Sequence, residues 1–318
     1  MKKFLIINLI LLTVVLAISE IYSYFIVKNT IGDYYDIFNE QAKKNNTSPM
    51  SLRYNFLKEF NQNDYKFLER NISYGKNKNK KSVLFFGCSY TYGSNVEEKD
   101  TMPYLVSEQT GRTTVNKAIP GASILNSLLV LLDEDFYGLF DKINEPEYIV
   151  YTFINDHLGR ITSLYKVMFI QDNNKYELMP EFEVKDNSVS IKKRSKILYP
   201  FYHLYTAKAL SYYYSYNLSF SKQRNEKMFE LLNAAKMITD EKFKNSKFVV
   251  IVYKDGSHSG MDRSLWEKLE NSGFIMLDAE ELAGHELESL EWRGEDKEHP
   301  NPAAFRDVSK GLIKALNL

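Results

Sequence analysis

Between residues 82 and 318 the chain alternates short apolar runs with longer amphipathic segments. The apolar runs predict strands at VLFF (83–86), TTVNKA (113–118), YIVYTF (148–153), FVVIVY (248–253) and FIMLD (274–278). Helical periodicity follows at 101–110, 123–136, 225–243, 263–272 and 302–317. This alternation is typical of a parallel sheet that helices cover on both faces. We therefore predict an α/β domain with five parallel strands, whose ligands bind outside the carboxyl ends of the strands.

The stretch from about 160 to 225 breaks this rhythm. Residues 167–193 alternate and turn in the manner of one or two hairpins, and residues 198–220 are rich in tyrosine. We interpret the stretch as an insertion between the third and fourth strands, and we expect it to cover the active-site face. Its aromatic side chains either line a sugar-binding groove or pack the insertion onto the core.

The first residues predict an export or anchoring segment. Lys2 and Lys3 precede an apolar run from Phe4 to Val27 in which Glu20 is the one charged residue. About 20 apolar residues suffice to cross a bilayer, and the paired lysines favour a cytoplasmic start. We therefore predict a membrane anchor over 1–27 and a polar stalk over 28–81. A catalytic domain over 82–318 would then lie outside the cytoplasmic membrane, in the periplasm or at the cell surface. A cleaved signal peptide is the alternative.

Composition narrows the function classes. Lysine plus arginine equals aspartate plus glutamate, at 41 each, so no global field favours nucleic acid. The one cysteine, Cys88, excludes an intramolecular disulfide and a cysteine-rich metal site. The histidines show no metal-ligand spacing, and no phosphate-binding or dinucleotide-binding glycine motif is present. We predict no metal and no organic cofactor.

Four short blocks carry candidate chemistry. They are GCSYTYG (87–93) after the first strand, NKAIPGAS (116–123) after the second, INDHLGR (154–160) after the third, and DKEHPNPAAF (296–305) before the last helix. A serine hydroxyl becomes a nucleophile when a neighbouring base accepts its proton, and a neutral imidazole can do so near pH 7. The imidazole needs a carboxylate that fixes its tautomer, and acyl transfer needs donors for the oxyanion. Nothing near Cys88 in the sequence would lower the pKa of its thiol, so the hydroxyl is the better candidate.

These four blocks resemble those of the SGNH (GDSL-like) hydrolases. The resemblance covers about 82–318, apart from the insertion, and implies a three-layer, flavodoxin-like α/β/α domain. It implies that Ser89 is the nucleophile, His299 the general base and Asp296 its partner. It also implies an oxyanion hole formed by Ser89, Gly121 and Asn155. Two positions depart from the family pattern: Cys88 replaces an aspartate, as in membrane-tethered members that handle polysaccharide acyl groups, and Phe153 replaces a glycine.

Residues just beyond Asn155 are further candidates. We predict that Asp156, His157 and Arg160 contact substrate, with the alternative that Asp156 caps or braces its loop. The function expected from the whole pattern is hydrolysis of O-acyl groups, O-acetyl above all, on an extracytoplasmic glycan. One alternative is an O-acyltransferase that works on a cell-surface polysaccharide with a multispanning membrane partner. The other is a non-catalytic protein of the same fold that binds or assembles glycans.

Overall fold

The computed structural model describes residues 13–24, 72–73, 75, 77, 79–162, 170–172, 175–177, 181–185, 188–192, 221–254, 260–287 and 289–318. The chain divides into two compact units. One comprises Met1–Phe60, Thr162–Glu181 and Ile191–Phe220, and the other comprises Asn61–Ile161, Phe182–Ser190 and Ser221–Leu318. The second unit contains all the residues that the sequence singles out for chemistry.

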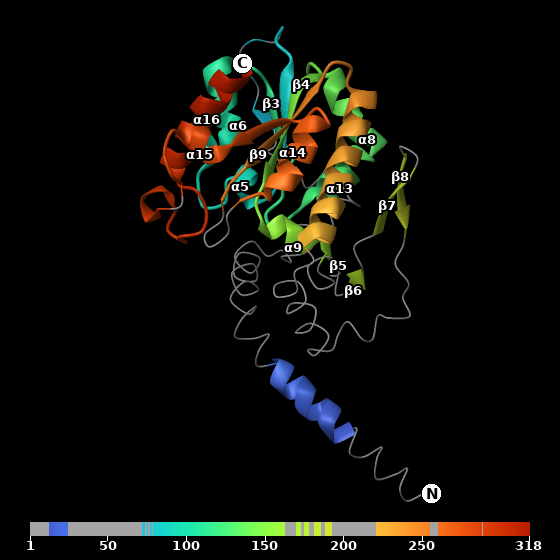
Figure 1. The fold of residues 1–318 in the computed structure, drawn as a ribbon. Coiled ribbons are helices and arrows are strands. Elements are labelled where there is room, and N and C mark those ends of the chain that lie inside the picture. Colours follow the sequence, from blue (N-terminus) through green and yellow to red (C-terminus); the bar gives the residue numbers. More distant parts are fainter. Residues whose placement is uncertain are drawn as a thin grey trace, which may run out of the picture. The chain divides into compact units, whose positions relative to one another are not determined.

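A sheet with the strand order β1-β3-β2-β4-β9-β10 forms the centre of the second unit (Figure 1). Its strands are β1 (Ile72–Ser73), β2 (Ser82–Phe86), β3 (Thr114–Asn116), β4 (Pro146–Phe153), β9 (Lys247–Val252) and β10 (Ile275–Asp278). Five of these strands pair in parallel, which confirms the predicted parallel sheet; they are β2, β3, β4, β9 and β10. Strand β1 was not predicted, because it is two residues long in a polar segment; it pairs antiparallel with β3.

The strand order locates the edge where a ligand site is expected. Among the parallel strands, the chain forms β2 first, then adds β3 on one side of it, and then adds β4, β9 and β10 in turn on the other side. The direction of winding therefore reverses between β2 and β4. Open parallel sheets bind ligands outside the carboxyl ends of the strands at such a reversal. Ser89 follows β2 and Asn155 follows β4, so both candidates flank the reversal.

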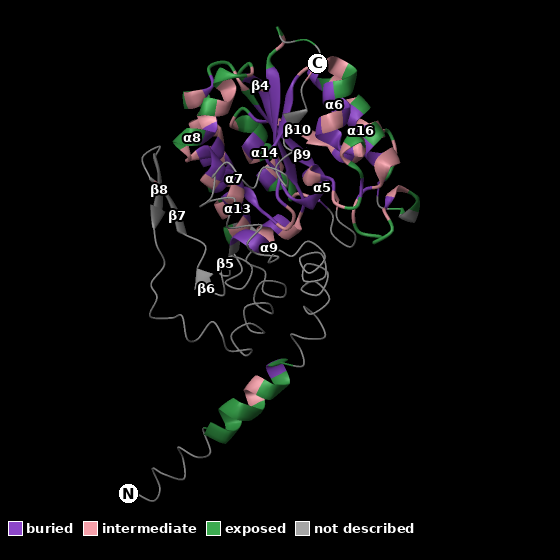
Figure 2. Cartoon of the chain, turned by 180° about the vertical axis from the view of Figure 1, so that it is seen from behind, coloured by how far each residue is buried: buried purple, intermediate pink, exposed green. Residues whose placement is uncertain are grey.

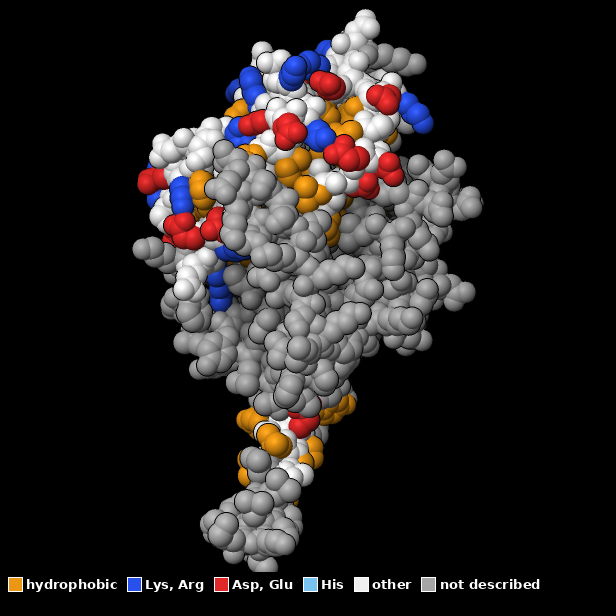
Figure 3. Space-filling model, turned by 90° about the vertical axis from the view of Figure 1, so that its right-hand side faces the viewer, with side chains coloured by type: hydrophobic (Ala, Val, Ile, Leu, Met, Phe, Trp, Pro, Cys, Tyr) orange, Lys and Arg blue, Asp and Glu red, His pale blue; other side chains and the backbone are white. Residues whose placement is uncertain are grey.

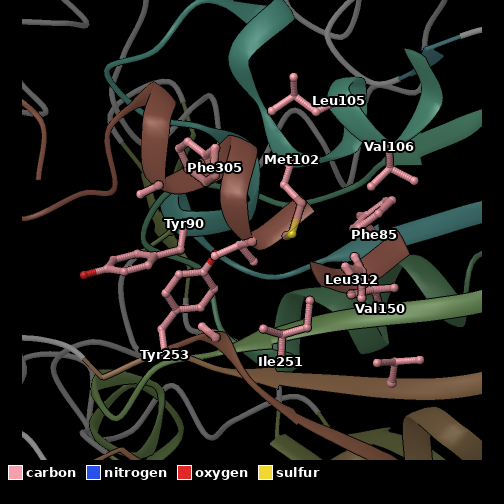
Figure 4. Close-up of a cluster of buried hydrophobic side chains, with 14 of the residues drawn as sticks. Phe85, Tyr90, Met102, Leu105, Val106, Val150, Ile251, Tyr253, Phe305 and Leu312 are labelled. Carbon is pink, nitrogen blue, oxygen red and sulfur yellow. The ribbon is translucent and has the colours of Figure 1, made fainter. Parts of the chain in front are cut away.

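Two helical layers cover the sheet (Figures 1 and 2). One contains α6 (Met102–Thr110), α15 (Ala279–Ala283) and α16 (Pro302–Leu316), and the other contains α7 (Ile124–Leu131), α13 (Ser221–Lys242) and α14 (Arg263–Asn271). Successive strand residues face opposite layers. Phe85 packs with Met102, Val106 and Leu312 in the cluster shown in Figure 4. Strands β2, β3, β4 and β9 are consequently buried on both faces, as continuous apolar runs predict, whereas β10 is half-buried.

Local capping explains where several helices begin and end. The helix predicted over 123–136 is instead α7 followed by α8 (Glu134–Tyr137), because the Asp133 carboxylate accepts the Asp135 N–H at 3.1 Å and starts a new helix. The Asn301 side chain accepts two N–H groups at the start of α16. The remaining short elements of this unit are α5 (Ser89–Tyr92), η2 (Glu98–Asp100), η3 (Gly138–Asp141), α9 (Asp156–Thr162) and η5 (Leu290–Trp292).

The predicted insertion contains two small sheets within its described residues. Strands β5 (Ile170–Asp172) and β6 (Lys175–Glu177) pair antiparallel, and β7 (Glu181–Lys185) pairs with β8 (Ser188–Lys192). These confirm the hairpins expected over 167–193. The tyrosine-rich stretch 198–220 lies outside the described residues.

The described part of the predicted anchor is a helix over residues 13–24. Its apolar side chains are exposed, among them Val14 at 49% and Ile18 at 61%, and Figure 3 shows hydrophobic side chains on its surface. Within the residues that the structure describes, no helix combines the length and the apolar character that a bilayer crossing needs. Most of the predicted stalk, 28–81, lies outside the described residues.

Candidate active site

The nucleophile candidate sits on a sharp turn between β2 and α5. Gly87 has a φ of 147°, and a Cβ there would overlap the Thr91 hydroxyl, so the turn requires glycine. Cys88 precedes the single-turn helix α5, whose first residue is Ser89. Ser89 is 7% exposed, and its carbonyl accepts the N–H groups of Gly93 and Ser94 at 3.0 and 3.1 Å. The hydroxyl is thus held on a rigid turn at the carboxyl end of a central strand.

The structure brings Ser89, His299 and Asp296 together in one relay. The Nε2 atom of His299 lies 2.7 Å from the Ser89 Oγ atom, although 210 residues separate them in the chain. The Nδ1 atom of the same ring bonds the Oδ2 atom of Asp296. A carboxylate can only accept, so this bond places the ring proton on Nδ1 and leaves Nε2 to accept the serine proton. The arrangement is that of a nucleophile, a general base and an orienting acid.

A tight loop fixes the acid–base pair. Arg293 and Pro300 form an antiparallel bridge, and the Gly294 N–H donates to the His299 carbonyl at 2.7 Å. Lys297 lies between Asp296 and His299 with a φ of 60°, and its N–H donates to the Gly294 carbonyl at 2.9 Å. Backbone bonds across the loop therefore set the positions of both side chains before α16 begins.

The Asp296 carboxylate is held in its ionised form. Burial would raise its pKa, but hydrogen bonds from the His299 side chain and from the backbone N–H groups of His299 and Glu298 outweigh it and lower the pKa from its ordinary value of 3.8. Both backbone bonds end on Oδ1 at 3.1 Å, which leaves Oδ2 for the imidazole. The carboxylate is therefore oriented and charged at neutral pH, as the partner of an imidazolium must be.

Three residues that the sequence analysis did not single out support the relay. The Asn95 amide donates to the same Oδ2 atom of Asp296. The Tyr90 hydroxyl donates to the Glu298 carbonyl at 2.8 Å, and Arg293 donates to that carbonyl at 2.6 Å and to the tyrosine oxygen at 2.9 Å. The Tyr90 ring lies 5.5 Å from the His299 ring and 5.3 Å from Tyr253, at one end of the buried cluster (Figure 4). Two of the contacts end on a backbone carbonyl, which no sequence motif marks.

The other oxyanion candidates follow the neighbouring strands. Gly121 lies in the loop after β3 with a φ of 68°, and the Ile119 N–H ties this loop to the Gly87 carbonyl at 3.1 Å. Asn155 follows β4, and its carbonyl accepts the Leu158 N–H at 3.0 Å. Both residues are partly exposed. The loops that carry Gly121, Ser89 and Asn155 thus leave three adjacent strands, β3, β2 and β4, at one edge of the sheet.

Two of the three candidates beyond Asn155, His157 and Arg160, are buried. Arg160 is 6% exposed, forms an ion pair with Asp156, and donates to the Ala122 carbonyl at 2.7 Å. His157 is fully buried, and its Nδ1 atom lies 2.7 Å from the Tyr151 hydroxyl oxygen. We therefore expect His157 and Arg160 to hold the loop rather than to contact substrate, which differs from the role expected from the sequence. Asp156 braces Arg160, as the alternative reading of that residue had it.

Cys88 is a buried thiol. Burial raises its pKa from the ordinary value of 9.0, so the thiolate that a nucleophile would need is disfavoured. Among the described residues, no group of three or more histidine, cysteine, aspartate or glutamate side chains is arranged to hold a metal ion.

Comparisons with known proteins find similar solved structures but no similar sequence. No protein-family model and no curated protein sequence matches the chain. A candidate GDSL-like lipase from Parabacteroides merdae is 14% identical with a TM-score of 0.43, covering 74% of this chain and 95% of its own. An acetyl xylan esterase from the rumen bacterium Butyrivibrio proteoclasticus is 10% identical with a TM-score of 0.43, covering 75% and 64%. A candidate lipolytic protein of the G-D-S-L family from Desulfitobacterium hafniense is 10% identical with a TM-score of 0.38, covering 74% and 99%. At such identities and scores, the activity has to be inferred from the residues of this chain.

Proposed function

We propose that this chain is an SGNH-type serine esterase that removes O-acyl groups, O-acetyl above all, from an extracytoplasmic glycan. The observation that carries the proposal is the relay itself, in which the Ser89 Oγ atom lies 2.7 Å from the His299 Nε2 atom and the Nδ1 atom of that ring bonds Asp296. A hydroxyl, an imidazole and a carboxylate in this order are what acyl transfer through a serine requires.

In the first half of the reaction, the Ser89 oxygen attacks the carbonyl carbon of the acyl group, and its proton moves to Nε2 of His299. The carbonyl π electrons move to oxygen and form a tetrahedral oxyanion. When this intermediate collapses, the bond between the acyl carbon and the sugar oxygen breaks. His299 gives its proton to that oxygen, so the free sugar hydroxyl departs and an acyl-Ser89 ester remains.

The oxyanion needs donors that are in place before the reaction begins. We assign this role to the backbone N–H groups of Ser89 and Gly121 and to the side-chain amide of Asn155. Ser89 and Asn155 flank the reversal of winding between β2 and β4, and Gly121 follows the adjacent strand β3. The positive φ of Gly121 belongs to a backbone conformation that lets the chain approach a ligand closely.

In the second half, His299 takes a proton from an acceptor hydroxyl, whose oxygen attacks the acyl carbon and forms a second tetrahedral oxyanion. When this collapses, the bond between the acyl carbon and the Ser89 oxygen breaks, and His299 returns the proton to Ser89. With water as acceptor the product is a free acid, and the chain is an esterase. With a sugar hydroxyl as acceptor the product is a new ester, and the chain is an acyltransferase, for which a multispanning membrane protein is the expected partner. The acyl-enzyme is common to both, so the acceptor has to be determined by experiment.

The proposed location rests on the N-terminal segment. Between Phe4 and Val27 the sequence has one charged residue, Glu20, and the described helix over 13–24 exposes its apolar side chains. We propose that this segment anchors the chain in the cytoplasmic membrane with the site on the outer side. Retention of the full chain in the membrane fraction after alkaline extraction would support this proposal, and release into the soluble fraction would refute it.

The full chain is incubated with 4-nitrophenyl acetate and with an O-acetylated oligosaccharide, with and without an unacetylated oligosaccharide as acceptor. Free acetate supports the esterase, and acetate on the acceptor supports the transferase. Ser89→Ala should lower turnover at least about 10³-fold. Ser94→Ala, a serine of the same loop whose contact to Ser89 is made by its backbone, should leave it unchanged. Turnover equal in wild type and Ser89→Ala would overturn the enzymatic proposal and favour a glycan-binding protein of this fold.

A further inference from the structure

The Arg160 side chain joins the start of α9, which follows β4, to the loop that follows β3. Asp156 and Arg160 lie one turn apart on α9, and the Arg160 Nε and Nη2 atoms approach the Asp156 Oδ2 atom at 2.7 and 2.5 Å. The Nη1 atom of Arg160 donates to the Ala122 carbonyl at 2.7 Å. A planar guanidinium can serve a carboxylate and a carbonyl at the same time, which a lysine ammonium cannot do with comparable geometry.

The two anchor points of this pair adjoin the proposed oxyanion donors. Ala122 directly follows Gly121, and Asp156 directly follows Asn155. Arg160 therefore connects the loop of one donor to the loop of the other through its own side chain. Because the guanidinium is 6% exposed, its bonds replace those that water would otherwise supply, and each of them is held in place.

The pair also lies close to the nucleophile turn. Burial raises the pKa of Cys88, the residue before Ser89, while the charge of Arg160 opposes this effect and the charge of Asp156 adds to it. The pair therefore contacts two of the three loops that carry the proposed oxyanion hole, and its charges lie within electrostatic reach of the residue before Ser89.

We propose that Arg160 is a positioning residue that holds the Gly121 and Asn155 loops at the spacing that the oxyanion requires. The inference rests on the proposed function and goes beyond it, because Arg160 acts through Ala122 and Asp156 and does not touch the substrate. Loss of the clamp should impair the transition state, in which the oxyanion exists, more than the ground state, in which it does not.

The chain contains a matched control at the opposite edge of the sheet. Arg112 forms an ion pair with Glu147 at 2.7 Å and donates to the Lys81 carbonyl at 3.1 Å, so it too joins a carboxylate to a backbone oxygen. The Arg112 side chain is 11% exposed. Arg112 uses its Nη1 atom for both partners, whereas Arg160 uses Nε and Nη2 for the carboxylate and Nη1 for the carbonyl. Arg112 precedes β3 and Arg160 follows β4, so the control makes a comparable link at the other edge.

The experiment compares Arg160→Gln, Arg160→Lys and Arg112→Gln in the full chain. We measure kcat and KM for 4-nitrophenyl acetate, the rate at which a fluorophosphonate labels Ser89, and the thermal unfolding midpoint. Arg160→Gln should lower kcat and the labelling rate about 10²-fold, the size of a lost oxyanion donor, with little change in KM. Arg160→Lys should keep kcat and the labelling rate below about a tenth of their wild-type values, because lysine keeps the positive charge but lacks the planar set of N–H donors. Arg112→Gln should lower the unfolding midpoint and leave kcat unchanged.

Two outcomes overturn the positioning role. A raised KM with an unchanged kcat would make Arg160 a substrate contact, and equal kcat values for Arg160→Gln and wild type would leave it without a part in the reaction. Should Arg160→Gln fail to fold, the double variant Asp156→Asn/Arg160→Gln removes both charges together and is measured in the same way. Absence of Ser89 labelling and of turnover in wild type would instead refute the proposed function, so the two failures are distinguishable.

Discussion

An arginine joins a carboxylate to a backbone carbonyl at both edges of the central sheet: at the starting edge, where the parallel strands begin, and at the finishing edge, where they end. At the edge where the strands begin, Arg112 links Glu147 to the Lys81 carbonyl, and at the edge where they finish, Arg160 links Asp156 to the Ala122 carbonyl. Around the first pair, backbone hydrogen bonds join the starts of neighbouring strands. The Ser82 N–H donates to the Glu145 carbonyl at 3.1 Å, and the Val83 N–H donates to the Thr113 carbonyl at 3.0 Å. Around the second pair, the loops contain polar residues such as Ser89, which follows the turn after β2, and Asn155, which follows β4.

Both edges contain residues with a positive φ, but the neighbours of these residues differ. Gly87 and Gly121 at the finishing edge have positive φ values of 147° and 68°, as does Lys297 at 60° in the loop of His299. Unusual backbone conformations persist where the surroundings hold them, and they are concentrated at functional sites. The starting edge also has positive φ values, at Gly111 (70°), which ends α6 as a helix cap, and at Asn245 (70°) and Gly273 (82°), which lie in the turns before β9 and β10. A positive φ therefore does not by itself mark a site, and what distinguishes Gly87 and Lys297 is that they adjoin the side chains of the relay.

The sharpest test of this contrast exchanges one glycine at each edge for alanine. Gly87→Ala puts a Cβ against the Thr91 hydroxyl, and Gly111→Ala puts one 3.7 Å from Asn77, in ordinary contact. Both should lose stability through the positive φ, Gly87→Ala about 1–3 kcal/mol and Gly111→Ala about 1–2 kcal/mol. Gly87→Ala should in addition lose at least about 10²-fold in kcat, because the turn that carries Ser89 must shift. Denaturant unfolding and esterase kinetics measure both; a matching loss of kcat in Gly111→Ala would remove the contrast.

The sequence predicts the strands of the sheet and the residues of the relay, but it predicts few of the side-chain contacts at either edge. Continuous apolar runs such as 148–153 predict strands because the sheet is buried on both faces. The order of the four blocks predicts that Ser89, Asp296 and His299 belong together, and the structure places them in hydrogen-bond contact. It does not predict that Arg160 and Tyr90 bond backbone carbonyls, because every residue has a carbonyl and the partner leaves no trace in the side-chain pattern.

A second, smaller contrast concerns two exposed asparagines. Asn95 at the finishing edge donates its amide to Asp296, whereas Asn77 at the starting edge accepts the Asn79 N–H at 3.1 Å within its own turn. Asn95→Ala should lower kcat/KM about tenfold, because roughly 1.4 kcal/mol of transition-state stabilisation corresponds to that factor. Asn77→Ala should leave kcat/KM unchanged. Steady-state kinetics of the two variants test this, and wild-type kinetics in Asn95→Ala would exclude it from the positioning of Asp296.

The smallest expected effect is the dependence of stability on pH at Asp296. Hydrogen bonds from His299 and the backbone lower the pKa of this carboxyl in the folded chain in spite of its burial. A carboxyl with a lowered folded pKa contributes stability above its unfolded pKa of about 3.9, and the contribution is lost as the pH falls through the folded value. Because the group is partly exposed, solvent screening keeps the contribution modest. The unfolding midpoint of Asp296→Asn should therefore lie below that of wild type by a few degrees at pH 7 and approach it below about pH 3.9. A difference that is constant with pH would mean that the variant loses packing rather than a charged hydrogen-bond acceptor.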